Sequence, residues 1–159
     1  MKQVTVKAIE RAIKKVDNLD DSGLERIAET YALAQQTLLG YIMSAAEEYE
    51  NEELAGLLIY YFCLINEAFA QEQIKCTAVE GDMIESFEEP FFETLDAYFD
   101  KDDEEILFEY TDQSELMRFL MTEISTPDDD GTTLDDETAT QLFIVCTALI
   151  TLLSRSAEA

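Results

Sequence analysis

Two pairs of carboxylates have a spacing that could support chemistry in this sequence. The stretch ESFE places Glu85 and Glu88 three residues apart, and the stretch EYTD does the same for Glu109 and Asp112. On a helix, residues i and i+3 share one face, so each pair could present two oxygen ligands together. Because Mg²⁺ prefers oxygen ligands, two such pairs on facing helices would form a candidate metal site.

This pattern resembles the metal-binding helices of all-α NTP pyrophosphatases of the MazG and dUTPase-like type. Those proteins carry ExxE on one helix and ExxD on another, and the four carboxylates hold magnesium. The resemblance extends over about 28 residues of this chain. It implies a magnesium-dependent nucleotide hydrolase whose metal ligands are Glu85, Glu88, Glu109 and Asp112. The basic residues near these motifs that could hold phosphates are Lys101 and Arg118.

The absence of histidine excludes several classes of enzyme. Catalysis by Ser-His-Asp or Cys-His groups, His-ligated zinc and the Glu-x-x-His di-iron site all require this residue. The sequence also lacks the glycine-rich patterns GxGxxG and GxxxxGK[ST], which excludes nucleotide enzymes built on such loops. Any remaining enzyme must therefore use carboxylates, Tyr, Lys or Arg, most suitably with magnesium or manganese.

A second candidate metal site is the acidic stretch TPDDDGTTLDDE at residues 126–137. With Gly131 placed at position 6 of an EF-hand calcium loop, three ligand positions match. The matching residues are Asp128, Asp130 and Glu137. Positions 1 and 9 do not match, because they hold threonine and leucine. In the structural alternative, the Asp-Gly pair forms a turn and Thr133 caps the last helix, whose first turn favours acidic residues.

Negative charge is the most extreme property of the chain, with 36 acidic and 10 basic residues and a net charge of −26. Phosphate backbones would be repelled, so direct binding of nucleic acid is not expected, and an anionic membrane surface is disfavoured for the same reason. A basic protein is the natural complement, and attraction toward it would depend on salt. The same composition also fits a highly solvated domain or an adaptation to salt.

Residues 80–137 concentrate this charge, with 22 acidic and two basic residues. Aromatic residues are interleaved with the acids at helical spacing, which is typical of core positions. Acidic helices with occasional exposed aromatic residues also suit docking onto a basic protein. The residues expected to contact such a partner are Glu88, Glu89, Asp100, Asp102, Asp103, Glu104, Asp128, Asp129 and Asp130. In this respect the chain is similar to nucleic-acid mimics and to immunity proteins that cover the active site of a nuclease toxin.

Apolar residues recur at helical spacing along the chain and predict one all-α domain, residues 1–159, with six or seven helices. The expected helices cover about 6–16, 24–49, 51–69, 82–99, 101–110, 114–124 and 134–155. Ser22 and Asn51 should be the N-caps of the helices 24–49 and 51–69. These two helices should pack antiparallel, with Gly40 and Gly56 at close contacts. Pro90 should kink or break its helix. The run LFIVCTALITLL predicts a buried C-terminal helix.

The first 18 residues predict a basic amphipathic helix. This helix could pack on the acidic body within one chain, or exchange between the two chains of a homodimer. No signal peptide is evident, and the longest apolar runs, 54–65 and 142–153, fall short of the roughly 20 residues of a membrane span. Three widely spaced cysteines without a CxxC pair predict reduced thiols and a cytoplasmic protein.

These features together predict a non-catalytic, acidic helical interaction protein that needs no cofactor. It would reach a basic partner by electrostatic steering and then dock through residues 80–137, as an inhibitor, an immunity-type protein or a nucleic-acid mimic does. The magnesium-dependent NTP hydrolase is the alternative from a different class. A structural domain whose acidity serves only solvation is the third.

Overall fold

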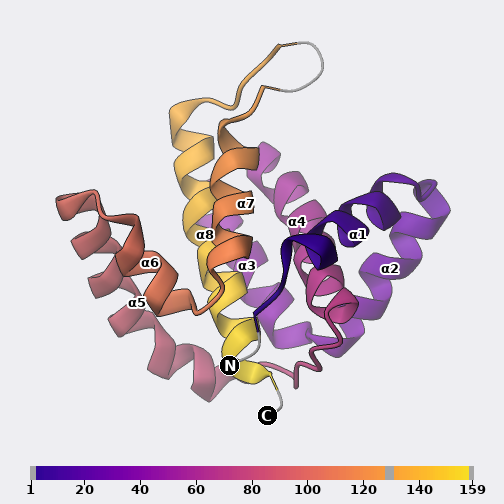
Figure 1. The fold of residues 1–159 in the computed structure, drawn as a ribbon, viewed down its shortest axis with the longest axis horizontal. Helices are drawn as coiled ribbons and strands as arrows, with labels where there is room; N and C mark the ends of the chain where they lie inside the picture. The colour runs from indigo at the N-terminus through magenta and orange to yellow at the C-terminus, as the bar shows by residue number, and fades with distance from the viewer. Residues whose placement is uncertain (1–2, 128–130, 158–159) are drawn as a thin grey trace.

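The structure is a computed structural model that describes residues 3–127 and 131–157. Within these residues the chain is an all-α bundle of eight helices without strands (Figure 1). The helices are α1 (Val6–Asp17), α2 (Asp21–Ala34), α3 (Gln36–Glu48), α4 (Glu52–Gln71), α5 (Gly81–Lys101), α6 (Glu104–Thr111), α7 (Ser114–Ser125) and α8 (Asp136–Ser156). An isolated antiparallel bridge between Cys76 and Ala157 joins the loop after α4 to the end of α8.

Helices α4 and α8 contact each other and form the centre of the bundle. Helices α1, α2 and α3 pack on α4, while α6 and α7 pack on α8 (Figure 1). Helix α5 pairs with α6 and touches the flank of α8, so that these two helices form an arm on the opposite side from α1 and α2. The basic helix α1 therefore contacts α4 of its own chain, and whether α1 exchanges between two chains stays a prediction.

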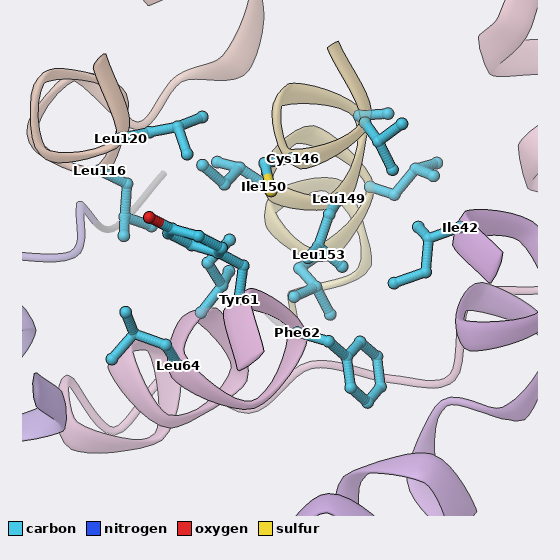
Figure 2. Packing of buried hydrophobic residues seen from close by; sticks show 14 of the residues in the cluster. Ile42, Tyr61, Phe62, Leu64, Leu116, Leu120, Cys146, Leu149, Ile150 and Leu153 are labelled. Atoms are coloured by element: carbon cyan, nitrogen blue, oxygen red, sulfur yellow. The ribbon is translucent and has the colours of Figure 1, made fainter. Parts of the chain in front are cut away.

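The predicted buried C-terminal helix is confirmed. Nearly every residue of α8 from Gln141 to Leu153 is buried or partly buried, on all faces of the helix. Its side chains interdigitate with those of α4, and Figure 2 shows Leu149 and Leu153 opposite Phe62. Burial of one such side chain contributes about 1.5–3 kcal/mol, so the contact between α4 and α8 contributes substantially to stability.

The predicted single helix 24–49 is wrong, because the chain leaves helical geometry at Gln35. The local sequence AQQT contains no helix breaker, so the cause lies in tertiary contacts. The Gln35 side chain is buried, and its amide donates to the carbonyl of Thr77 (2.9 Å) and accepts from the N–H of Val79 (2.8 Å). Gln35 thereby satisfies two backbone groups of the loop after α4 and separates α2 from α3.

Replacing Gln35 with alanine is expected to lower the free energy of unfolding by about 2 kcal/mol, since two backbone groups near the core lose their partners. The neighbouring Gln36 is exposed, and its replacement with alanine is the matched control, with an expected change near zero. Urea denaturation of both variants measures the difference. Equal stabilities for the two variants would show that the Gln35 amide does not hold the loop.

Several helix ends differ from the sequence-based expectation in a systematic way. Asn51 caps α4 as predicted, accepting from the N–H of Leu54 (3.1 Å). Asp20 rather than Ser22 caps α2, and Asp135 rather than Thr133 caps α8. In both corrections an aspartate replaces a hydroxyl residue as the acceptor, because its carboxylate forms a charge-assisted hydrogen bond with the backbone.

The fold also bears on the predictions about Pro90, Gly40 and Gly56. Helix α5 continues through Pro90, so the predicted break does not occur and the alternative, a kink, stays a prediction; the Thr94 hydroxyl donates to the Pro90 carbonyl (2.8 Å). Gly40 and Gly56 are exposed, with nothing within 4 Å of where a Cβ would lie. The proposed close packing at these glycines is therefore wrong, since both lie on solvent-facing sides of their helices.

Helices α4 and α8 are each long and apolar enough to span a membrane by length and composition alone. Their apolar windows are 61% and 72% buried within the bundle, respectively. Such burial is typical of the core helices of a globular domain, which pass the same test.

Candidate functional site

The four predicted metal ligands lie on two helices of the α5–α6 arm and at one helix end. Glu85 and Glu88 belong to α5, Glu109 belongs to α6, and Asp112 is the C-cap of α6. Asp112 also accepts hydrogen bonds from the Gln3 side chain, which occupies part of its surface. Within residues 3–127 and 131–157, no group of three or more Asp, Glu or Cys side chains is placed to hold a metal ion. The structure thus gives no support to this ligand set, and the magnesium hydrolase stays a prediction.

Six of the acids predicted to bind a partner lie within the described residues. They are located on α5 and at the start of α6. Glu88, Glu89 and Asp100 lie on α5, and all but the half-buried Glu88 are exposed. The remaining three form the junction with α6: Asp102 adopts the left-handed conformation that ends α5, Asp103 caps α6, and Glu104 begins it. Asp128, Asp129 and Asp130 lie outside the described residues, as does the centre of the predicted calcium loop. Five of the six described acids are therefore exposed on the arm, and four of the six cluster between Asp100 and Glu104, at the end of α5 and the start of α6.

Aromatic residues of α5 divide between the core and the surface. Phe87 and Phe91 stack at 4.7 Å between ring centroids and lie against Tyr110 of α6. The Arg155 guanidinium of α8 covers Tyr110 at 4.5 Å and so ties the arm to the central helix. In contrast, Phe92 and Phe99 are 48% and 52% exposed and stand among the acids on the solvent side. The prediction that most of these aromatics form the core, with a few exposed, matches this arrangement.

A cleft of about 270 Å³ opens between α3 and α5, with α8 at its floor. The floor consists of apolar residues of α8, namely Ile144, Val145 and Ala148. Aromatic residues form its two walls. One wall holds Tyr41 of α3 and Tyr49, the C-cap of α3, and the other holds Phe91 and Phe92 of α5. Glu48 and Glu88 complete the lining from opposite walls, together with Ser44 and Ala45. Among the described residues no lysine or arginine lines this cleft.

The electrostatics of the cleft are those of a negative, partly apolar site. Burial, followed by the negative charges of Glu88 and Glu48, raises the pKa of Tyr41 to about 12. Burial and Glu48 also raise the pKa of Tyr49. Both phenols are therefore neutral hydroxyl groups at physiological pH, and the only charges in the cleft are carboxylates. A positively charged group with an apolar body is the natural complement.

Glu67 of α4 is a buried carboxylate, 2% exposed, that no sequence motif singled out. The hydroxyl of Tyr31 and the amide of Gln71 (2.8 Å) donate to Glu67, and the ammonium of Lys15 lies 3.0 Å away. Burial raises the pKa of Glu67, but the hydrogen bonds from these three residues outweigh it and the net pKa is lowered. Because Glu67 is fully paired with side chains of α1, α2 and α4, it is a structural group.

The three cysteines are free thiols with no activating group. Cys63 and Cys146 are buried, and Cys76 is half-buried beside the end of α8. Burial raises the pKa of Cys63 and of Cys76 to about 11, and that of Cys146 still further. A reactive cysteine requires a lowered pKa, so none of these thiols has the character of a nucleophile.

The fold and the cleft define this chain as a small all-α bundle with an acidic arm and an aromatic, carboxylate-bearing cleft beside it. The chain matches no protein-family model, no curated protein and no solved structure. Its function must therefore be inferred from the site itself.

Proposed function

We propose that this chain is a non-catalytic interaction protein that binds a basic partner protein through its acidic α5–α6 arm. The observation that carries the proposal is the exposed face of α5, where carboxylates surround two half-exposed phenylalanines. The carboxylates attract and orient a basic surface, and the phenylalanines provide apolar contact after docking. This chemistry fits an inhibitor, an immunity-type protein or a nucleic-acid mimic in the cytoplasm.

The charge distribution supports steering by the arm in particular. Residues 80–112, which comprise the arm and its two flanking residues, hold 14 of the 36 acidic residues of the chain but only one of its ten basic residues. Six basic residues lie within the first 26 positions, and α1 and α2 pack on the opposite side of the bundle (Figure 1). The charge of the molecule is therefore distributed asymmetrically, with the negative charge concentrated on the arm. A basic partner is drawn toward the arm rather than toward α1.

The test is recovery of a basic partner followed by a binding measurement at two salt concentrations. The immobilised chain at low salt should retain a protein of high isoelectric point from an extract of its own cell. The dissociation constant of the purified pair should weaken about tenfold or more between 0.05 and 0.5 M NaCl, because steering between exposed charges is screened. Retention of no basic protein, or an affinity that salt leaves unchanged, would contradict the proposal.

A pair of matched variants locates the binding face. The first neutralises three exposed acids of the arm, Glu89→Gln, Asp100→Asn and Glu104→Gln, and should slow association by about tenfold at low salt. The control neutralises three exposed acids elsewhere, Glu25→Gln, Glu29→Gln and Glu47→Gln, with the same change in net charge. Equal effects of the two variants would show that total charge, and not the arm, determines binding.

A further inference from the structure

We infer that the cleft between α3, α5 and α8 receives one amphipathic helix of the basic partner, which inserts apolar side chains and pairs its cationic residues with Glu48 and Glu88. The inference rests on the proposed function and adds the place and the kind of segment that binds. It extends the binding face beyond residues 80–137, because one wall of the cleft belongs to α3.

The size of the cleft favours side chains of a protein over a small molecule. Pockets that enclose drug-sized ligands typically measure about 300–1,000 Å³ and bury most of the ligand. This cleft measures about 270 Å³, below that range, and lies between α3 and α5 with α8 at its floor. It therefore accommodates one or two large side chains, while the helix that carries them lies across the opening.

The composition of the lining selects the chemistry of the occupant. Ile144, Val145 and Ala148 of the floor offer only apolar contact, so the inserted groups must be apolar. The aromatic walls can in addition stack with the guanidinium group of an arginine. Carboxylates stand on both walls without a basic residue in the lining, so a cation at each edge of the inserted segment would be paired. A helix with an apolar stripe flanked by Lys and Arg meets all three requirements.

Phe92 is the residue that connects the cleft with the acidic arm. Its ring is 48% exposed at the mouth of the cleft, and its centroid lies 5.6 Å from that of Phe91 inside. An apolar ring held at this boundary gains burial only when another molecule covers it. Phe92 is thus expected to be a strong contributor to binding, as aromatic residues commonly are at the centre of interfaces.

The helix of its own chain that most resembles such a ligand is not available to fill the cleft. The basic helix α1 buries its apolar residues Ala8, Ile9, Ala12 and Val16 against the bundle. A second copy could offer α1 only by unpacking that face from α4. The charge and the apolar stripe that the cleft requires must therefore come from a different protein.

The experiment measures binding of a synthetic 18-residue helical peptide with leucines on one face and Lys and Arg on the flanks. A second peptide has the same composition in an order that forms no apolar stripe. Fluorescence anisotropy at 0.05 M NaCl should show roughly tenfold tighter binding of the amphipathic peptide to the full chain, since only that peptide can insert leucines while it pairs its cations. Equal affinities of the two peptides would overturn the inference.

Variants of the cleft distinguish insertion from general attraction. Phe92→Ser removes a central aromatic contact, and Ser44→Trp fills the cleft. Each should weaken binding of the amphipathic peptide by roughly tenfold. The controls are Leu33→Ser, which removes a 67% exposed residue of α2, and Ser22→Trp on the same helix. These controls should change the affinity by less than about twofold, as expected of surface positions outside an interface.

The outcomes separate this inference from the proposed function. If the purified basic partner binds with the expected salt dependence but Phe92→Ser and Leu33→Ser bind it equally, the cleft is not the docking site and the proposed function survives. If the chain binds neither a basic partner nor either peptide, the proposed function fails and the inference fails with it. Circular dichroism of each variant verifies that the helical fold is retained in the comparison.

Discussion

Replacing Glu67 with alanine is expected to lower the free energy of unfolding by about 3 kcal/mol at neutral pH, because a fully paired buried group is removed. The change leaves the Tyr31 hydroxyl without its acceptor and the Lys15 ammonium without its carboxylate, and it opens a cavity against α4. The ion pair itself accounts for a small part of this loss, since the Lys15 side chain is 51% exposed and therefore screened by solvent.

The size of the effect follows from the position of Glu67 between three helices. Lys15 belongs to α1 and Tyr31 to α2, whereas Glu67 and Gln71 are both on α4. One carboxylate thereby fixes both α1 and α2 against α4, the outer layer of that side of the bundle (Figure 1). We expect the Glu67→Ala variant to lose protection from amide hydrogen exchange in α1 and α2 before the other helices.

The contribution of Glu67 depends on pH in a direction that its lowered pKa determines. A carboxyl group whose pKa is lower in the folded than in the unfolded chain stabilises the fold above its ordinary pKa, near 4.5. The stabilisation is lost as the pH falls through the lowered value. Glu67→Gln retains the shape but not the charge, so it should cost about 1 kcal/mol at pH 7 and progressively less at pH values below the lowered pKa of Glu67. An equal cost at pH 7 and below the lowered pKa would contradict the assignment.

Lys15 provides the complementary variant, because it supplies one of the interactions that lower the pKa of Glu67. In Lys15→Met the effect of burial is opposed only by Tyr31 and Gln71, so the pKa of Glu67 rises and acid unfolding begins at a higher pH. The control Lys14→Met removes the same charge from the exposed neighbouring position. Acid titrations followed by circular dichroism should separate the two variants if Lys15 acts through Glu67.

The fold could be predicted from the sequence where local patterns decide it. Helical spacing located the helices, and the apolar run of α8 identified the central one, because a helix apolar on all faces has to be buried. The number of helices was underestimated because the break at Gln35 arises from a buried amide that binds a loop more than 40 positions away. No local propensity encodes such a contact.

The candidate site was predictable only in its charge. The acidic edge of α5 and α6 follows from composition, whereas the cleft depends on how far α3 stands from α5 across the flank of α8. Tyr41 and Tyr49 lie outside the acidic region, so nothing in their local sequence links them to Phe92. Glu67 was missed because it is one of 36 acids and the helix around it has the composition of a core element. A single acid within an apolar run is the signal that would have located it.

The stability of the whole chain is expected to depend strongly on salt, with a rise in Tm of roughly 10 °C between 0.02 and 0.5 M NaCl. The net charge of −26 makes the folded state repel itself, and salt at the higher concentration screens exposed charges beyond a few ångströms. For a domain of this size, a gain of about 3 kcal/mol corresponds to such a shift. Thermal melts by circular dichroism measure it, and sucrose, which adds no charge, serves as the control for solvent exclusion.

The same melts distinguish screening from a specific metal site. Mg²⁺ or Ca²⁺ that acts by screening should raise Tm gradually over the millimolar range, whereas a specific site would saturate at a defined stoichiometry. Glu85, Glu88, Glu109 and Asp112 form no ligand group in the part of the chain that the structure describes, so gradual behaviour is expected of Mg²⁺. Saturation with Mg²⁺ that is lost in Glu85→Gln would instead support the magnesium site.

Neutralising acids of the arm tests whether its negative charge serves solvation or binding. Neutralising three exposed acids of the arm should stabilise the chain at low salt by about 1 kcal/mol, since like charges on neighbouring helical turns repel. Neutralising three exposed acids of α2 and α3 should stabilise it by a similar amount. If only the first change weakens binding of the partner, the charge of the arm serves binding and is retained although it lowers stability. If neither change affects the partner, the acidity serves solvation alone.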